Sequence, residues 1–305
     1  MDNRQIPTGA EIENYLREGR NWGRWGNEGS AGAINLITPA KRVEAAGLVK
    51  SGKPVSLSRP LPVNPTPQNP RPVEHYMKAE TGPDGRGSAL DYVGIFPHGV
   101  SVTHIDALCH AWDQDGMWDG RDPAVEITFD GAKYGSVDVW SSGIMTRGVL
   151  LDVPKHRGEP YVTVDTPVHG WELEDIVREQ DIEVGPGDAV LVYCGREEYS
   201  AANEDAFTEG TAMPGLHGSC LPFIRDHDAA VLGLDMLDAS PNDSGIPLPV
   251  HGVLYAYGVA ILDNALLEPL VEACLNEGRY EFLLTINPLV IQGGTGSAVN
   301  PIAVF

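Results

Sequence analysis

Apolar segments of strand length and of helix length alternate along the second half of the chain, and this alternation constrains the fold most. After residue 147, short β-branched runs are separated by longer stretches with the apolar spacing of helices. The predicted strands are 148–153, 189–194, 229–234, 259–262 and 281–286, and the predicted helices are 172–180, 219–226, 250–257 and 266–277. Such alternation is typical of an α/β fold, in which helices flank a sheet.

Helix signals are clearest near the N-terminus. Residues 9–19 have the pattern of a short amphipathic helix. Thr38 followed by Pro39 predicts an N-cap with proline at the first helical position, so a second helix should begin there and end at Gly52. The apolar face expected for this second helix consists of Val43, Ala46 and Leu48.

Proline dominates the stretch that follows a predicted strand at 55–58. Seven prolines lie between residues 59 and 87, and proline removes a backbone donor and fixes φ, so neither a ladder nor a helix is expected there. Such a loop either covers a site or a partner subunit, or forms a solvated arm. We therefore predict an N-terminal extension with helices over 1–53 and one domain over 54–305.

Charge and cysteine content limit the possible partners. The 305 residues contain 21 Lys and Arg against 43 Asp and Glu, a net charge of −22, which disfavours binding to nucleic acid or to anionic membranes. The longest apolar run, 253–262, is too short to span a bilayer. The four cysteines show no CxxC spacing, and the first residues do not resemble a signal peptide, so we expect a cytoplasmic protein that acts on a small molecule.

A cluster of histidines marks the candidate site. His98, His104 and His110 lie within thirteen residues, together with Asp106. If 102–107 is a strand, side chains alternate between its faces, so His104 and Asp106 point the same way. Imidazole and carboxylate are natural ligands for zinc or manganese. Ordinary polar residues at a strand end are the alternative, which the clustering disfavours.

Two residues near the C-terminus extend this candidate site. His251 follows Pro249 in the first turn of a predicted helix, and Asp263 lies twelve residues later at the end of the next strand. Open α/β sheets bind ligands at strand ends, so both side chains are expected to face a common crevice. A histidine near a helix start and an aspartate at a strand end are each common in structural roles. The presence of the first cluster favours a functional role for this pair.

These residue types suit metal-assisted hydrolysis. A divalent cation lowers the pKa of bound water and polarises a carbonyl group, and His110 has a pKa near neutrality that suits proton transfer. A serine nucleophile lacks the GxSxG motif, and Cys109 would lie on the strand face opposite His104. A catalytically silent binding protein and a metal-dependent lyase or dehydratase remain alternatives.

The motif itself resembles a known family. Thr103-His104-x-Asp106-x-x-x-His110 is similar to the HxGTHxDxPxH signature of the metal-dependent cyclase or kynurenine formamidase-like hydrolases, which include arylformamidases and isatin hydrolases. The resemblance continues in segments spread over residues 50 to 305: Gly148-Val-Leu-Leu-Asp152, Pro214-Gly-Leu, Leu232-Gly-Leu-Asp235, His251-x11-Asp263-Asn264 and Pro288-Leu-x-x-x-Gly-Gly-Thr-Gly-Ser297.

This resemblance implies a swivelling β/β/α fold with a mixed sheet flanked by helices, assembly as a homodimer or homotetramer, and hydrolysis of amides, cyclic imides or lactones. It implies Zn²⁺ or Mn²⁺ held by His104, Asp106, His251 and Asp263, with His110 transferring protons.

The chain departs from the signature at two positions. Val100 occupies the place of the first family histidine, and Leu108 replaces the proline. We favour His98 as the substitute ligand, because Gly99 permits a bulge and two extra residues preserve the strand face. A single-ion site built on His104, Asp106 and either His251 or Asp263 is the alternative.

Aromatic residues near the motif suggest a flat or apolar substrate. Phe96, Trp112 and Trp118 flank the histidine cluster, and Met117 lies beside Trp118 in a Gly- and Asp-rich loop. These side chains either line a pocket or fill the core, since both environments favour large apolar groups.

Overall fold

The computed structural model describes residues 4–208 and 210–305 and contains a nine-stranded mixed sheet flanked by helices, as the alternation predicts. The strand order is β1-β13-β11-β7-β8-β9-β10-β4-β12. The strands are β1 (Pro54–Ser56), β4 (His104–Asp106), β7 (Ile144–Asp152), β8 (Ala189–Tyr193), β9 (Val231–Leu234), β10 (Ala260–Asp263), β11 (Glu281–Ile286), β12 (Gly296–Ala298) and β13 (Ile302–Val304).

Parallel pairing occurs only in the centre of this sheet, among the described residues. The four strands β7, β8, β9 and β10 run parallel to one another, and every other pair in the sheet, including β7 with β11 and β10 with β4, is antiparallel. The central strands are almost wholly apolar and buried, which is expected for strands covered on both faces. The antiparallel additions place β4 between β10 and β12, near one edge.

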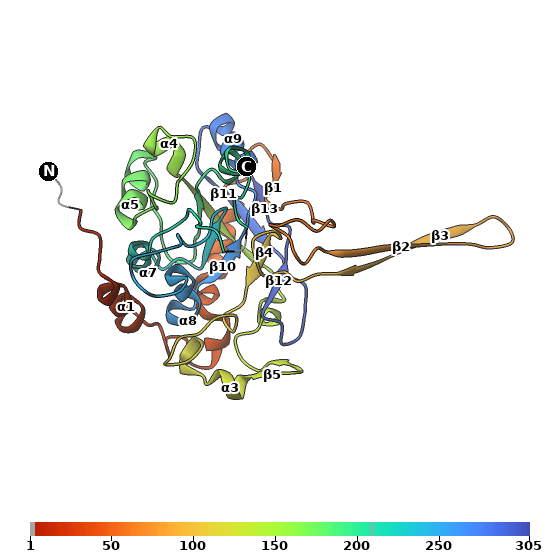
Figure 1. The fold of residues 1–305 in the computed structure, drawn as a ribbon, viewed down its shortest axis with the longest axis horizontal. Coiled ribbons are helices and arrows are strands. Elements are labelled where there is room, and N and C mark those ends of the chain that lie inside the picture. Colours follow the sequence, from red (N-terminus) through yellow and green to blue (C-terminus); the bar gives the residue numbers. More distant parts are fainter. Residues whose placement is uncertain (1–3, 209) are drawn as a thin grey trace.

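Short helices surround the sheet (Figure 1). They are α1 (Gly9–Glu18), α2 (Pro39–Ala46), α3 (Pro123–Glu126), α4 (Val153–Arg157), α5 (Gly170–Glu179), α6 (Arg196–Ala202), α7 (Leu221–Asp226), α8 (Gly252–Tyr257) and α9 (Glu268–Glu277). Helix α1 contacts α7 and α8 and buries Ile12 and Leu16, so the N-terminal segment packs into the main core. None of the helices in the described part of the chain is long and apolar enough to cross a membrane.

Helix α2 differs from its prediction. Thr38 caps it as expected, but the helix ends at Ala46 with Gly47 at its C-cap, well before Gly52. Its buried residue is Ala45, whereas the Val43 side chain is 73% exposed. The predicted apolar face is therefore wrong, because the eight-residue helix is too short for the periodicity on which that face was based.

The proline-rich stretch also differs. Strands β2 (Glu74–Thr81) and β3 (Gly87–Gly94) form an antiparallel ribbon that projects from the body (Figure 1). The expectation that no ladder forms before residue 87 is wrong, since residues 74–81 contain no proline and Pro83 lies in the turn between the strands. All eight residues of β2 are exposed. Two further short strands, β5 (Ile127–Thr128) and β6 (Gly131–Ala132), form a separate hairpin.

The large apolar side chains near the histidine motif have different environments. Met117 and Trp118 are fully buried, and the Trp118 indole Nε1 donates a hydrogen bond to the Gly29 carbonyl at 2.7 Å. These two residues are therefore part of the core. Trp112 and Phe96 are 49% and 66% exposed, which leaves them accessible to a ligand.

Candidate metal and catalytic site

Strand β4 positions the central pair of the site. His104 and Asp106 share one face, with His104 Nε2 at 3.3 Å from Asp106 Oδ1, while Ile105 between them is buried in the core. Pairing with β10 sets Asp263 opposite His104, and pairing with β12 sets Gly296 opposite Asp106. The alternation of a strand therefore brings two sequence-predicted residues together, and the sheet register adds the third.

Hydrogen bonding orients the His104 ring. Its Nδ1 lies 2.8 Å from the Val102 carbonyl oxygen, an acceptor, so Nδ1 carries the proton and donates it. Nε2 then faces the carboxylates, 4.0 Å from Asp263 Oδ2 in addition to its contact with Asp106. A ring fixed through its second nitrogen is the usual arrangement of a metal-binding histidine.

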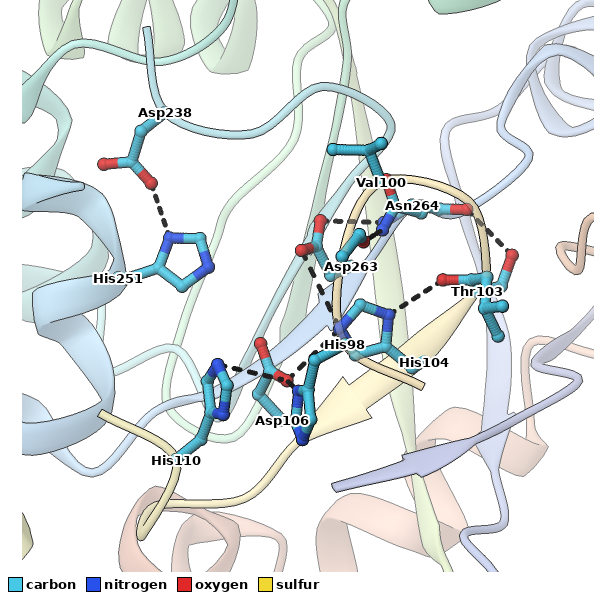
Figure 2. A network of polar contacts seen from close by, with 12 residues as sticks. His98, Val100, Thr103, His104, Asp106, His110, Asp238, His251, Asp263 and Asn264 are labelled. Atoms are coloured by element: carbon cyan, nitrogen blue, oxygen red, sulfur yellow. Dashed lines mark hydrogen bonds and ion pairs between the residues drawn. The ribbon is translucent and has the colours of Figure 1, made fainter. Parts of the chain in front are cut away.

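His98 lies beside the same carboxylate, although its sequence position departs from the family signature. Its Nδ1 is 2.7 Å from Asp106 Oδ1 (Figure 2). Its Nε2 is 2.9 Å from the Thr295 hydroxyl. Gly99, with φ of 120°, adopts a backbone conformation that other residues rarely reach. Gly296 allows the close approach, because a Cβ there would lie 2.7 Å from His98 Cε1.

A polar network holds the loop that carries His98. The Asn264 side chain donates to the Gly99 carbonyl, and the Arg196 guanidinium donates to the Val100 carbonyl. Arg196 also donates to Asn264 Oδ1 at 2.6 Å, and the Thr103 hydroxyl donates to the Asn264 carbonyl at 2.8 Å. Since Asn264 directly follows Asp263, the network joins the two halves of the site.

His110 stacks against His98 just beyond the strand. The two rings are nearly parallel, at 6°, with centroids 3.9 Å apart. His110 Nε2 lies 4.0 Å from Asp106 Oδ1, longer than a hydrogen bond, and its side chain stays partly exposed. A histidine in this position contacts both the carboxylate and the solvent side of the site.

Two overlapping groups of ligand atoms meet at Asp106. Nitrogen or oxygen atoms of His98, Asp106 and His110 lie within 4.8 Å of one another, and so do those of His104, Asp106 and Asp263. Asp106 Oδ2 is buried and has no hydrogen-bond partner among the described residues. A buried, unpaired carboxylate oxygen is costly, and a cation would relieve that cost, so these residues fit a divalent metal.

His251 lies outside both groups. Its Nδ1 is 2.6 Å from Asp238 Oδ2, and Figure 2 shows the ring turned toward that carboxylate. Asp238 also accepts a hydrogen bond from the Val250 backbone N–H. The carboxylate fixes the ring through one nitrogen and leaves Nε2 available, as in carboxylate–histidine pairs at metal sites.

Electrostatics separates the histidines into two kinds. Burial works against protonation of His104, but Asp106 and Asp263 outweigh it and raise its pKa to about 9. Burial also opposes the charge of His251, and Asp238 raises that pKa to about 9. Burial and the neighbouring imidazoles lower the pKa of His110 to about 4, in spite of Asp106. His110 is therefore neutral at pH 7 and able to accept a proton.

The two carboxylates shift in opposite directions. Burial alone would raise the pKa of Asp106, but the His104 charge and the hydrogen bonds of His104 and His98 hold it well below its usual range. Burial, with the nearby Asp106 charge, raises the pKa of Asp263 despite His104 and His251. Asp106 is therefore the carboxylate at the centre of the site that stays ionised at neutral pH.

Several residues that support the site are not predicted from the sequence. Asp238, Arg196 and Thr295 each contact a candidate ligand or the loop that carries one. Thr295 and Asn264 lie within segments that resemble the family, which is the only sequence signal for them. Cys109, considered as a nucleophile, has a pKa raised to about 12 by burial, so its thiol stays protonated at neutral pH.

Comparisons with known proteins agree with this architecture. The family model described as putative cyclase matches residues 55–241. The solved structure of a novel cyclase is 30% identical, covers 94% of this chain and 99% of its own, and superposes with a TM-score of 0.80.

Two isatin hydrolases share the fold at lower identity. One, solved with the product analogue thioisatinate, is 20% identical over 87% of this chain and 94% of its own, with a TM-score of 0.58. Isatin hydrolase A from Labrenzia aggregata, bound to benzyl benzoate, is 19% identical over 85% and 94%, with a TM-score of 0.56. No curated protein matches the chain significantly.

Proposed function

Because the chain belongs to the putative cyclase family, we propose that it is a metal-dependent hydrolase acting on an amide, cyclic imide or lactone carbonyl of a small molecule. The fold shared with isatin hydrolases supports a ring-opening or amide-cleaving reaction. The observation that carries the proposal is the Asp106 carboxylate, buried between two groups of potential ligands with one oxygen unpaired.

We assign the ligands to this chain's residues as follows. His104, Asp106 and Asp263 would hold one divalent ion, Zn²⁺ or Mn²⁺, because their ligand atoms lie within 4.8 Å of one another. His98, on the Asp106 carboxylate, and His251, whose Nδ1 is held by Asp238, would supply nitrogens to a second ion. A bound cation of this kind lowers the pKa of water and polarises a carbonyl group.

His110 transfers the protons in the proposed reaction. Its neutral ring accepts a proton from the attacking water and then delivers that proton to the leaving nitrogen or oxygen. Stacking on His98 holds the imidazole in place, and its partial exposure lets the substrate reach it. Asp106 attracts the resulting imidazolium and so favours the first transfer.

Metal stoichiometry decides between one ion and two. His98→Ala should lower the metal content per chain, or weaken metal affinity by about tenfold or more. If content and affinity stay unchanged, His98 only fixes Asp106, and a single ion bound by His104, Asp106 and Asp263 or His251 is the simpler site.

A substrate screen tests the proposed function directly. The purified protein, loaded with Zn²⁺ or Mn²⁺, should hydrolyse at least one compound among formanilides, lactams, lactones and isatin-like imides. Chelation should abolish turnover and the metal should restore it, with far-UV circular dichroism unchanged. Retained metal without turnover on any compound would identify a silent binding protein, and a product formed without addition of water would identify a lyase.

A further inference from the structure

A small pocket opens beside His98 and is formed mainly by apolar side chains. Its volume is about 210 Å³, and its walls come from the proline-rich loop, the segment before β4, and residues near Phe207 and Met213. Phe96 contributes a largely exposed ring to the wall. An accessible apolar wall next to candidate catalytic residues is the usual setting for the body of a substrate.

One cation distinguishes this pocket. Arg71 lies in the wall, with its guanidinium carbon 5.4 Å from the Phe96 ring centroid. Within residues 4–208 and 210–305, no aspartate or glutamate lines the pocket, and no carboxylate forms an ion pair with Arg71. The chain contains 43 acidic residues against 21 basic ones, and most of the described arginines pair with a carboxylate, so Arg71 is one of the few described arginines whose charge no described acid offsets.

The chemistry of guanidinium suits one kind of ligand group. Its planar fork of N–H donors matches a carboxylate and binds it through two hydrogen bonds, while the face of the group stacks on an aromatic ring. Arg71 lies over the Phe96 ring and is exposed, so its donors are accessible at the wall of the pocket. His98 also lines this pocket, and its contact with Asp106 connects the pocket to the candidate metal site.

From this arrangement we infer that the substrate carries a carboxylate, bound by Arg71, on a flat apolar body whose scissile carbonyl faces His98 and Asp106. The inference rests on the proposed hydrolase function and adds the substrate's charge. Phe96, Phe207 and Met213 contact the body of the substrate, and Arg71 selects the anion. An anionic substrate is repelled by a protein of net charge −22, and the positive charge of Arg71 offsets that repulsion locally.

Matched substrate pairs test the role of Arg71. The pairs are formanilide with 4-formamidobenzoate and isatin with isatin-5-carboxylate, each member differing by one carboxylate remote from the scissile bond. The wild type should prefer the anionic member. Arg71→Ala should raise its KM by about tenfold or more, with kcat within about twofold, and leave the neutral member unchanged. Arg71→Lys, which keeps the charge but loses the fork, should give an intermediate KM.

Arg86→Ala is the matched control. Arg86 lies in the turn of the projecting ribbon with a side chain 91% exposed, so its removal changes the net charge equally, away from the pocket. This variant should keep the wild-type KM for both members of each pair. An equal effect of Arg86→Ala and Arg71→Ala on the anionic substrate would overturn the inference, since only overall charge would then matter.

Binding separates this inference from the proposed function. If neither pair is hydrolysed, the hydrolase proposal fails for these substrates, and calorimetry with 4-formamidobenzoate and formanilide still tests Arg71. Tighter binding of the anion by wild type, lost in Arg71→Ala, supports the carboxylate site. Equal affinities in wild type, or an equal loss for both compounds in Arg71→Ala, would refute it.

Discussion

Two His–Asp pairs with the same separation occupy opposite environments in this molecule. His104 Nε2 lies 3.3 Å from Asp106 in the sheet, and His75 Nε2 lies 3.3 Å from Asp91 in the projecting ribbon. The side chains of the first pair are 2% and 1% exposed, and those of the second are 42% and 53% exposed. Water screens the electrostatic interaction between His75 and Asp91, whereas burial strengthens the interaction between His104 and Asp106.

Strand length does not explain this difference. Strand β4 has three residues and β2 has eight, yet the short strand holds the site because it has a neighbour on each side. The ribbon strands pair only with each other among the described residues. Position in the sheet, more than the length of the element, therefore turns a common pair of side chains into a candidate metal site.

The largest expected effect is the loss of the buried anion. Asp106→Asn keeps the shape of the side chain but removes the charge that attracts the metal, so metal content should fall and kcat/KM should drop by at least about 10³-fold. Asp91→Asn is the matched control in the ribbon and should keep both values. Elemental analysis and steady-state kinetics measure them, and full metal content in Asp106→Asn would contradict the assignment.

The next effect separates chemistry from metal binding. His110→Ala should lower kcat by about 10²-fold, the scale of a lost general acid–base, while metal content stays near that of the wild type. The comparison is His104→Ala, which should lose metal as well as activity. If His110→Ala retains full turnover on the best substrate, the proton travels through another group and His110 only supports the His98 ring.

A smaller effect is expected from crowding His98. Gly296→Ala would place a methyl group 2.7 Å from His98 Cε1 and equally close to the Ile105 carbonyl, so the ring must move away from Asp106. Metal affinity should fall by about tenfold, as for other disturbed ligand shells. Gly185→Ala, where a Cβ meets nothing within 4 Å, should bind metal like the wild type in the same titration.

The smallest expected signal is a proton count. His104, with its pKa near 9, is protonated at pH 7 in the metal-free protein and must lose that proton to bind a cation. Metal binding should therefore release about one proton per chain at pH 7, or two if His251 also binds, and the release should vanish above pH 9. Calorimetry in buffers of different ionisation enthalpy measures it, and zero release at pH 7 would exclude His104 as a ligand.

Sequence patterns predicted the features that follow from periodic spacing of apolar residues and from the alternation of strands and helices. The α/β alternation gave the central strands, and the two-residue period of a strand placed His104 and Asp106 on one face. Contacts that depend on distant segments were beyond such patterns. Asp238 supports His251 across thirteen positions, and Thr295 reaches His98 across 197. The number of prolines in 59–87 also led to the wrong prediction that no strand forms there, because the prolines flank β2 and do not interrupt it.

The clamp on the His98 loop has a consequence for the position of the His98 ring. Asn264 and Arg196 hold the loop by the backbone carbonyls of Gly99 and Val100, which every residue type offers. The Arg196 contact therefore fixes the path of the loop through the Val100 backbone, independently of the side chain there, and the loop still brings the His98 ring to Asp106.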